Sequence, residues 1–224
     1  ISRNVKMFYG VTPSRVSFLR ERYKLNLNKV NLLIMGADDE VFKLANSKTN
    51  IDFFRNKLKI SSDDFLIITG GKIDESKSEI LRLIDDFINA PIEMKLIVFG
   101  SLENSKYLDI LRHSQNMYYL GWLNTKEVYT AILASNLAIF PGRHSVYWEQ
   151  VIALRKPVIY SQKQGFEHLD IGGNCLFLSD LKYTNYVDML IEIKEKNYKK
   201  MILAAKSIKS EEFFYSNIAK ESLK

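Results

Sequence analysis

Apolar positions recur along the chain in two alternating patterns, one typical of buried strands and the other of amphipathic helices. Continuous apolar runs at residues 64–70 and 94–100 are typical of strands buried on both faces. The segment between them, residues 77–90, has apolar residues at helical spacing: Ile80, Leu83, Ile84, Phe87 and Ile88. The two patterns predict a strand, a helix and a second strand in succession.

This alternation continues to about residue 180. Further strands are predicted over residues 116–122, 137–142, 156–161 and 174–180, and further helices over 106–114, 125–136 and 145–155. Thr125 and Ser145 are the expected N-caps of the last two helices. Strands that alternate with helices imply right-handed crossovers, so the sequence predicts an α/β fold with a Rossmann-like, doubly wound parallel sheet.

The two ends of the chain have different patterns. Only helices are predicted after residue 181, over 182–195, 197–209 and 211–222, which gives the domain a helical C-terminal tail. Residues 1–47 predict a strand over 5–11, a helix over 12–23 and a strand over 29–36. Thr12 is the expected N-cap of that helix, with Pro13 at its first position. We expect one unit over residues 1–47 and a second over 48–224.

Composition narrows the class of protein. The chain of 224 residues is 46% hydrophobic and 26% charged, which is ordinary for a globular protein. Its single Cys175 excludes an internal disulfide or a cysteine-rich zinc site, and no apolar run approaches the ~20 residues that span a bilayer. We therefore expect a cytoplasmic protein. The chain begins with isoleucine, as an excised fragment would.

The net charge of +6 is concentrated near the N-terminus. Residues 1–30 contain seven Lys or Arg and one acid, Glu21. Such a patch can face nucleic acid, anionic lipid or a phosphorylated substrate, and a solvated helix face is an equal alternative. A nucleic-acid role rests on charge alone, and we do not expect one.

Polar and glycine residues gather where the predicted strands end. The first strand is followed by Gly70, Gly71, Lys72 and Lys77, a set in which glycines admit phosphate to the backbone and lysines supply charge. Neither the phosphate-loop motif nor the dinucleotide G-x-G-x-x-G motif is present, and a plain surface turn is the alternative. The second strand ends at Gly100.

The next two junctions add aromatic and ionisable groups. Trp122 follows the third strand, where an aromatic ring could frame a nucleobase. The fourth strand is followed by Arg143, His144 and Ser145, with Glu149 one turn inside the next helix. There a carboxylate could accept bonds from two sugar hydroxyls. The alternatives are an acid that interacts with the helix dipole and a structural histidine.

The order of these motifs resembles a known family. The chain has a glycine turn with two basic residues five apart, followed in order by VFG, GWL, PG…WEQ and KPVI…GFE. This succession resembles group 1 (family four) glycosyltransferases of GT-B fold, and more narrowly their members in bacterial polysaccharide assembly. The likeness runs from about Val5 to Asp180 and is strongest over 68–77 and 137–171. It implies the C-terminal, donor-binding half of a GT-B fold, with residues 1–47 as the end of the acceptor domain and the linker.

The resemblance also implies residue roles. Lys72 and Lys77 would bind the donor diphosphate, Glu149 the ribose hydroxyls and Trp122 the base, and Gly165, Phe166 and Glu167 would form a loop near the diphosphate. The family's first motif acid corresponds to Pro141, so Arg143, His144 and Ser145 are expected to contact the donor sugar instead.

The reaction implied by the resemblance moves a sugar from a nucleoside-diphosphate donor to a saccharide or lipid-linked acceptor, with retained configuration. We expect no cofactor and no metal, because the Asp-x-Asp signature is absent. Lys72, Lys77 and His144 are the expected catalytic residues. A peripheral contact with anionic lipid at the inner membrane face is also expected, because Arg15, Arg20 and Arg22 share one helix with no strongly apolar face. The rival functions are an inactive nucleotide-sugar-binding module and, less favoured, a receiver-like signalling domain.

Overall fold

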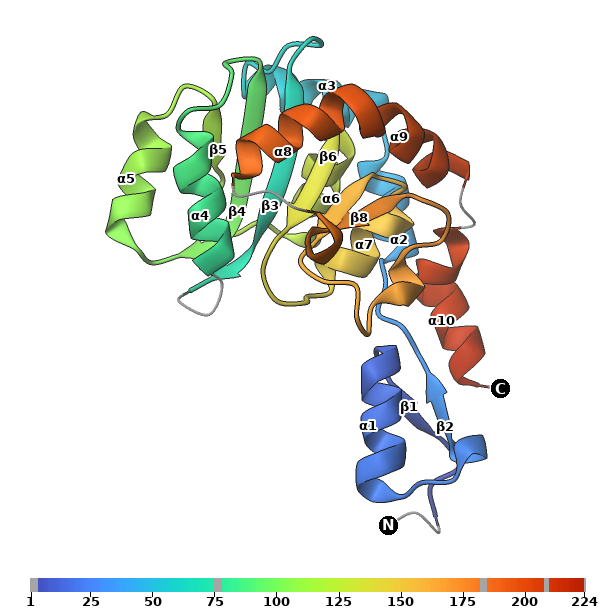
Figure 1. The fold of residues 1–224 in the computed structure, drawn as a ribbon. Helices are drawn as coiled ribbons and strands as arrows, with labels where there is room; N and C mark the ends of the chain where they lie inside the picture. The colour runs from blue at the N-terminus through green and yellow to red at the C-terminus, as the bar shows by residue number, and fades with distance from the viewer. Residues whose placement is uncertain (1–3, 75–77, 182–184, 208–209, 224) are drawn as a thin grey trace.

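The computed structural model describes residues 4–74, 78–181, 185–207 and 210–223 and contains a parallel sheet with helices on both faces (Figure 1). The sheet strands, in the order β5-β4-β3-β6-β7-β8, are all parallel to their neighbours. They are Phe65–Ile73 (β3), Met94–Leu102 (β4), Met117–Tyr119 (β5), Leu137–Phe140 (β6), Val158–Tyr160 (β7) and Cys175–Phe177 (β8). This order confirms the doubly wound α/β class and places its switch point between β3 and β6, where such sheets bind ligands.

Helices cover the sheet in two layers. One layer consists of α4 (Ser78–Phe87), α5 (Ser105–His113), α8 (Tyr186–Glu192) and α9 (Tyr198–Ser207). The other consists of α2 (Asp39–Ala45), α3 (Lys48–Lys57), α6 (Thr125–Ala134) and α7 (Tyr147–Ala153). Strand β3 shows why the apolar runs are continuous: Ile67 packs into the first layer, and Leu66 and Ile68 pack into the second. A strand with a helix layer on each face needs apolar residues at every position.

Several expected boundaries are wrong. The glycine-rich segment after residue 70 is not a surface turn, because β3 continues through Lys72 to Ile73 in register with β4. Helix α6 is capped by Asn124 and not by Thr125, in a capping box that Glu127 completes. Helix α7 begins after Val146 without a side-chain cap, so Ser145 is not its N-cap. Local periodicity shows neither how far two strands pair nor which of two adjacent polar residues caps a helix.

Helices α2 and α3 were not predicted from the sequence. Their N-caps are good local signals, because Asp38 accepts from the backbone N–H groups of Glu40 and Val41, and Ser47 accepts from that of Asn50. However, α2 is only seven residues long and α3 has only three apolar residues in ten, so neither gives a long periodic pattern. The tail also differs from expectation, since α8 and α9 are joined through a π-helical turn at Ile193–Asn197 without a break.

The N-terminal elements form a small group beneath the sheet (Figure 1). Strands β1 (Phe8–Gly10) and β2 (Val30–Leu32) pair in parallel, and α1 (Pro13–Tyr23) connects them. Thr12 is confirmed as the N-cap of α1, since its hydroxyl accepts from the backbone N–H of Arg15 at 3.3 Å, and Pro13 is the first helical residue.

The C-terminal tail binds both parts of the chain. The backbone N–H of Ala37 donates to the carbonyl oxygen of Phe213 at 2.8 Å. The backbone N–H of Tyr215, the first residue of α10 (Tyr215–Ser222), donates to the carbonyl oxygen of Ala37 at 2.9 Å. The Tyr9 hydroxyl donates to the carbonyl oxygen of Ser222 at 2.9 Å. Ala37 and Ala45 are buried within the core of the sheet. Residues from about 37 onward therefore pack with the sheet, while a domain boundary near residue 47 stays a prediction.

Candidate functional site

The carboxyl ends of β3 and β4 carry buried glycines in place of side chains. Gly71 pairs with Gly100 in the strand register, and both have positive φ angles, 118° and 103°. A Cβ on Gly100 would overlap the carbonyl oxygen of Gly71 and lie 2.7 Å from its carbonyl carbon. Gly70, the preceding residue, is also buried. Only glycine allows the two strands to remain this close beside the switch point.

Of the two predicted basic residues, Lys72 is the one that the structure describes. The Lys72 side chain is 75% exposed at the end of β3, with Nζ 3.6 Å from Asp74 Oδ2. An exposed pair at this distance holds the side chain only weakly, so the ammonium can turn toward an anion. Lys77 lies outside the described residues.

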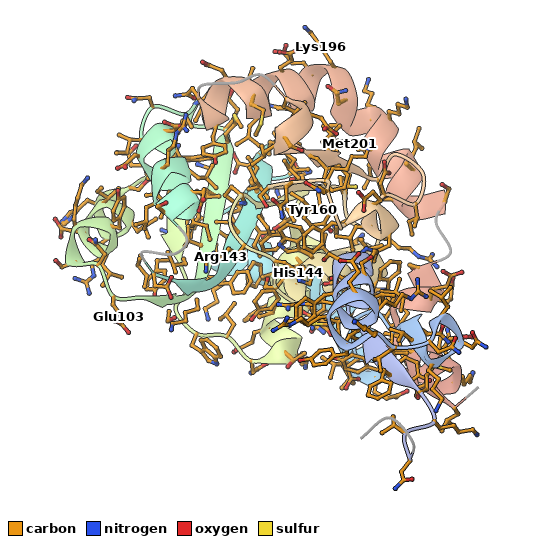
Figure 2. The ribbon with its side chains drawn as sticks, turned by 60° about the horizontal axis from the view of Figure 1, so that its bottom comes forward. Glu103, Arg143, His144, Tyr160, Lys196 and Met201 are labelled. Atoms are coloured by element: carbon orange, nitrogen blue, oxygen red, sulfur yellow. The ribbon has the colours of Figure 1, made fainter. Side chains whose placement is uncertain are left out.

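The loop after β6 carries the next three predicted residues. Pro141 and Gly142 are buried, whereas Arg143 is exposed. Figure 2 shows Arg143 and His144 on the face of the molecule that faces the viewer when its lower side is brought forward. The Ser145 carbonyl oxygen accepts from the Trp148 backbone N–H at 3.0 Å, so this residue belongs to the turn that begins α7. The loop thus brings Arg143 and His144 to the same edge as Lys72.

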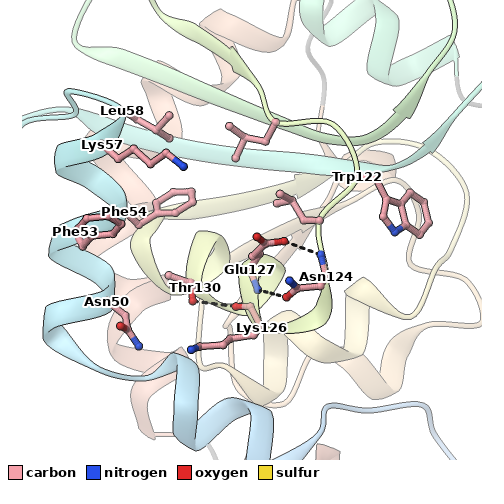
Figure 3. Close-up of a pocket in the computed structure, with 12 residues that line it drawn as sticks. Asn50, Phe53, Phe54, Lys57, Leu58, Trp122, Asn124, Lys126, Glu127 and Thr130 are labelled. Atoms are coloured by element: carbon pink, nitrogen blue, oxygen red, sulfur yellow. Dashed lines mark hydrogen bonds between the residues drawn. The ribbon is translucent and has the colours of Figure 1, made fainter.

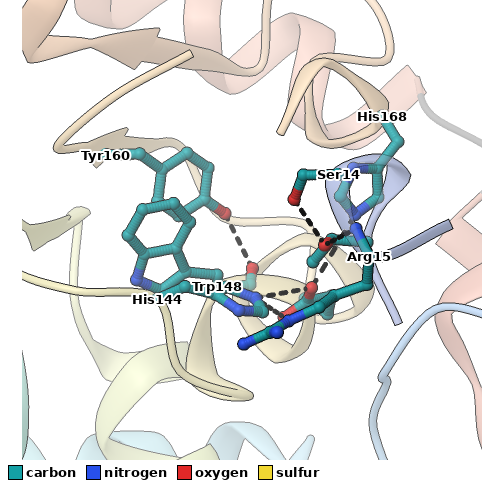
Figure 4. Close-up of polar contacts among 8 residues, drawn as sticks. Ser14, Arg15, His144, Trp148, Tyr160 and His168 are labelled. Carbon is teal, nitrogen blue, oxygen red and sulfur yellow. Dashed lines mark hydrogen bonds and ion pairs between the residues drawn. The ribbon is translucent and has the colours of Figure 1, made fainter. Parts of the chain in front are cut away.

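Glu149 is covered by two histidines. Its carboxylate is 0% exposed, and His144 Nε2 lies 2.8 Å from Oε1 and 3.1 Å from Oε2. His168 Nε2 approaches Oε1 at 3.8 Å, beyond hydrogen-bond distance (Figure 4). Burial raises the pKa of Glu149, but the contacts with His144 and His168 outweigh it, and the pKa is lowered overall. The group is therefore an anion held between two imidazoles.

Aromatic rings surround this cluster. The His144 ring packs against Trp148 at 5.2 Å, nearly perpendicular, and against Phe166 at 4.8 Å. Trp148 is buried and stacks on Tyr160 at 4.5 Å. Within the described residues, polar atoms of Trp148, Gln150 and His168 are buried without a hydrogen-bond partner. A wall of this kind limits the positions that His144 can take.

His168 was not anticipated from the sequence. It lies in a 3₁₀ turn over Glu167–Leu169, in the loop whose Gly165, Phe166 and Glu167 were predicted to bind ligand. Phe166 does reach the cluster, whereas Glu167 is exposed and accepts from the backbone N–H of Gly165, two residues earlier, at 3.1 Å. The available signal in the sequence was its position, because His168 directly follows the three loop residues that were predicted to bind ligand.

The N-terminal helix also meets this loop. A Cβ on Gly165 would lie 3.1 Å from the Ser14 Cβ, and the Ser14 and Thr12 hydroxyls are 2.9 Å apart. Figure 4 draws Ser14 and Arg15 in the same group as His144 and His168. The start of α1 therefore lies against the edge that carries Glu149, a contact that no local pattern predicts.

Trp122 lines a separate pocket of about 670 Å³ between α3 and the start of α6. Phe53, Phe54 and Leu58 form its α3 side, and the Trp122 side chain, on a residue 76% exposed, is turned away from that helix (Figure 3). Among the described residues, no hydrogen bond or ring contact connects Trp122 to the Glu149 cluster. Its contact with a base stays a prediction.

Neither a metal centre nor a membrane span is found in the part of the chain that the structure describes. No group of three or more His, Cys, Asp or Glu residues in the described part of the chain could hold a metal ion. None of the helices that the structure describes is long and apolar enough to cross a membrane.

Comparison with known proteins identifies the fold. No family model matches the sequence, and no curated protein matches it. Among solved structures, WaaG, a glycosyltransferase of lipopolysaccharide biosynthesis, is similar with a TM-score of 0.71 and 15% identity, over 96% of this chain and 61% of that one. Anabaena HepE in complex with UDP and glucose has a TM-score of 0.71 and 15% identity, over 97% and 62%. A Rickettsia africae glycosyltransferase has 0.72 and 14%, over 97% and 62%.

These similar structures are GT-B glycosyltransferases. They confirm that the sheet of this chain is the Rossmann-like half of such a fold, with helices at its C-terminal end. The chain spans about three fifths of their length. At this level of identity the likeness shows the fold alone.

Proposed function

We propose that the chain is the donor-binding part of a glycosyltransferase that uses a nucleoside-diphosphate sugar. The observation that carries the proposal is the glycine-lined, basic edge at the switch point of the sheet. The fold is shared with HepE, which has UDP-glucose bound in one structure and UDP and glucose in another. A backbone free of side chains at a strand end, with the exposed cations Lys72 and Arg143 nearby, is suited to a diphosphate.

In the proposed reaction, the bond between the sugar's anomeric carbon and the diphosphate oxygen breaks and a bond to an acceptor hydroxyl oxygen forms. The acceptor proton is released, and negative charge develops on the leaving diphosphate. Lys72 and Lys77 are proposed to stabilise that charge, as fixed cations do in transition states. We propose retention of configuration without a metal, with Gly70, Gly71 and Gly100 admitting the phosphates and Arg143, His144 and Ser145 near the sugar.

The acceptor is proposed to be a saccharide or a lipid-linked saccharide in bacterial surface-polysaccharide synthesis on the cytoplasmic side of the membrane. Support comes from the motif order in residues 137–171 and from the fold shared with WaaG, which acts in lipopolysaccharide biosynthesis. Groups that bind the acceptor would lie on parts of a longer protein that correspond to the remaining length of the similar structures.

Replacing Lys72 and Lys77 together with alanine is expected to weaken UDP binding by a few kcal/mol, at about 1.5–3 kcal/mol for each charged hydrogen bond lost. The fold should survive, because the Lys72 side chain is exposed and makes only a weak ion pair. Isothermal calorimetry with UDP measures the change. The matched control is Lys199→Ala with Lys200→Ala, which removes the same charge from the exposed surface of α9. Equal affinities for the two double variants would reject the assignment.

An inactive nucleotide-sugar-binding module is the alternative function. It is favoured by one observation: the Glu149 carboxylate is already occupied by His144 and has no exposed surface. Transfer or hydrolysis of the donor sugar by a longer protein that contains this chain would exclude it.

We also propose that the N-terminal elements contact anionic lipid, and two details of this expectation change. Arg20 is half-buried and donates to the Val30 carbonyl oxygen at 3.0 Å, so its guanidinium is tied to β2 and less exposed than those of Arg15 and Arg22. Contrary to expectation, exposed apolar side chains do accompany the charges, namely Phe18, Tyr23 and Leu27. Aromatic and aliphatic groups beside cations are suited to a membrane interface.

The expected result is binding to anionic vesicles that weakens as salt is raised, because each basic residue near the surface contributes about 1 kcal/mol. Arg15→Gln with Arg22→Gln should reduce sedimentation with phosphatidylserine vesicles, while Lys199→Gln with Lys200→Gln should not. Binding that is equal for neutral and anionic vesicles would contradict the proposal and favour packing of α1 against another protein surface.

A further inference from the structure

Glu149 and His144 are arranged so that the carboxylate cannot reach a ligand directly. The carboxylate is 0% exposed and both of its oxygens face His144 Nε2, at 2.8 and 3.1 Å. A sugar hydroxyl could replace this contact only if the His144 ring left its place between Trp148 and Phe166. Such a movement would leave a buried anion without its principal partner, which is costly.

His144 is the member of the cluster that remains partly accessible. Its side chain is 17% exposed, against 11% for His168 and 0% for Glu149. It follows β6, whose carboxyl end lies at the switch point of the sheet. Exposure therefore rises from Glu149 through His168 to His144, and both ring nitrogens of His168 are buried, so His144 is the better placed of the two histidines to meet a ligand.

The contact with Glu149 fixes which ring nitrogen of His144 is available. An ionised carboxylate only accepts hydrogen bonds, so Nε2 must carry the proton that it donates to Glu149. Nδ1 of His144 is then free to accept from a hydroxyl in the neutral ring. The same arrangement, in which a buried carboxylate sets the tautomer and direction of an imidazole, operates in the Ser-His-Asp triad.

We propose that Glu149 is a positioning residue, and that His144, held by it, accepts a hydrogen bond from a hydroxyl of the sugar to be transferred. His168 Nε2 lies 3.8 Å from Oε1, the same oxygen that His144 contacts, and adds a weaker electrostatic contact. The proposal rests on the proposed nucleotide-sugar function and goes beyond it: Glu149 binds no ribose, and the sugar is selected through a histidine at Nδ1.

The proposal is tested by calorimetry with two probes, UDP and UDP-glucose, which share the nucleoside diphosphate and differ in the sugar and in the charge of the terminal phosphate. Glu149→Gln, His144→Gln and the double variant are compared with the unsubstituted chain. Glutamine at 144 can place an amide N–H near Nε2 and so keep the contact with Glu149, but it lacks the second ring nitrogen. Thermal melts confirm that each variant is folded.

His144→Gln is expected to lower affinity for UDP-glucose by about tenfold, the usual effect of one hydrogen bond, and to leave UDP affinity within about twofold. Glu149→Gln should have the same selective effect. In the double variant the two losses should not add, because residues that act as a unit show coupling in such a cycle.

Each other outcome counts against the proposal. Equal losses for UDP and UDP-glucose in Glu149→Gln would indicate direct binding of the ribose, and losses that add would indicate independent contacts. No loss for UDP-glucose in His144→Gln would also overturn it. If the unsubstituted chain binds neither probe, the proposed function fails, and that result is distinguishable from all of these.

A second measurement keeps the test valid if a variant does not fold. The chain has three histidines, so nitrogen-proton correlation spectra can resolve the ring nitrogens of each in the unsubstituted chain. UDP-glucose is expected to change the Nδ1 signal of His144 and leave the proton on its Nε2. Loss of the Nε2 proton signal of His144 on addition of UDP-glucose would show that the contact with Glu149 is broken, and would reject the proposal.

Discussion

Replacing Trp148 with alanine is expected to lower the free energy of unfolding by about 3–5 kcal/mol, the range for a large aromatic residue removed from a packed core. Trp148 is fully buried, stacks on Tyr160 at 4.5 Å and contacts Phe166 at 4.9 Å. The Tyr160 hydroxyl also donates to the carbonyl oxygen of Trp148 at 2.7 Å, which fixes β7 against α7. The cavity left behind would lie directly beside the Glu149 cluster.

Urea unfolding measures this loss. The chain supplies its own control in its other tryptophan, because Trp122 is 76% exposed. Trp122→Ala should change stability by no more than about 0.5 kcal/mol, as surface substitutions usually do. If the two variants were equally stable, Trp148 would not be the packed centre of the site that the structure describes.

Replacing Gly100 with alanine is expected to cost about 1–3 kcal/mol for the backbone conformation and about 1–3 kcal/mol more for overpacking. The φ angle is 103°, and the new Cβ would overlap the Gly71 carbonyl oxygen on the neighbouring strand. Both obstacles are backbone, so the conflict cannot be relieved by turning a side chain. The ends of β3 and β4 would have to separate at the edge where the diphosphate is proposed to bind.

Gly121→Ala is the matched control. Gly121 also has a positive φ, 63°, but a Cβ there would meet nothing within 4 Å. It should lose only the conformational part, about 1–2 kcal/mol. Thermal or urea unfolding of the two variants compares them, and UDP affinity should fall in the Gly100 variant alone. Equal losses of stability would contradict the close approach of the two strands.

Much of the fold was determined by local sequence. Continuous apolar runs at residues 64–70 and 94–100 indicated buried parallel strands because each strand has a helix layer on both faces. The polar loop at residues 141–146 was correctly placed after β6, at the edge where the carboxyl ends of the parallel strands meet. Elements with weak apolar periodicity, such as α2 and α3, were not visible in the same way.

Only the tertiary structure decided the environment of Glu149. The sequence placed a carboxylate one turn inside a helix, but burial depends on contacts from His144, five residues away, and from His168, in a loop that follows the next strand. Likewise, β3 extends past Gly71 because β4 pairs with it, and Ser14 lies against Gly165 because the chain folds back. Periodicity reports which face of an element is apolar. Which polar groups meet depends on packing between distant segments, and that information exists only once the chain is folded.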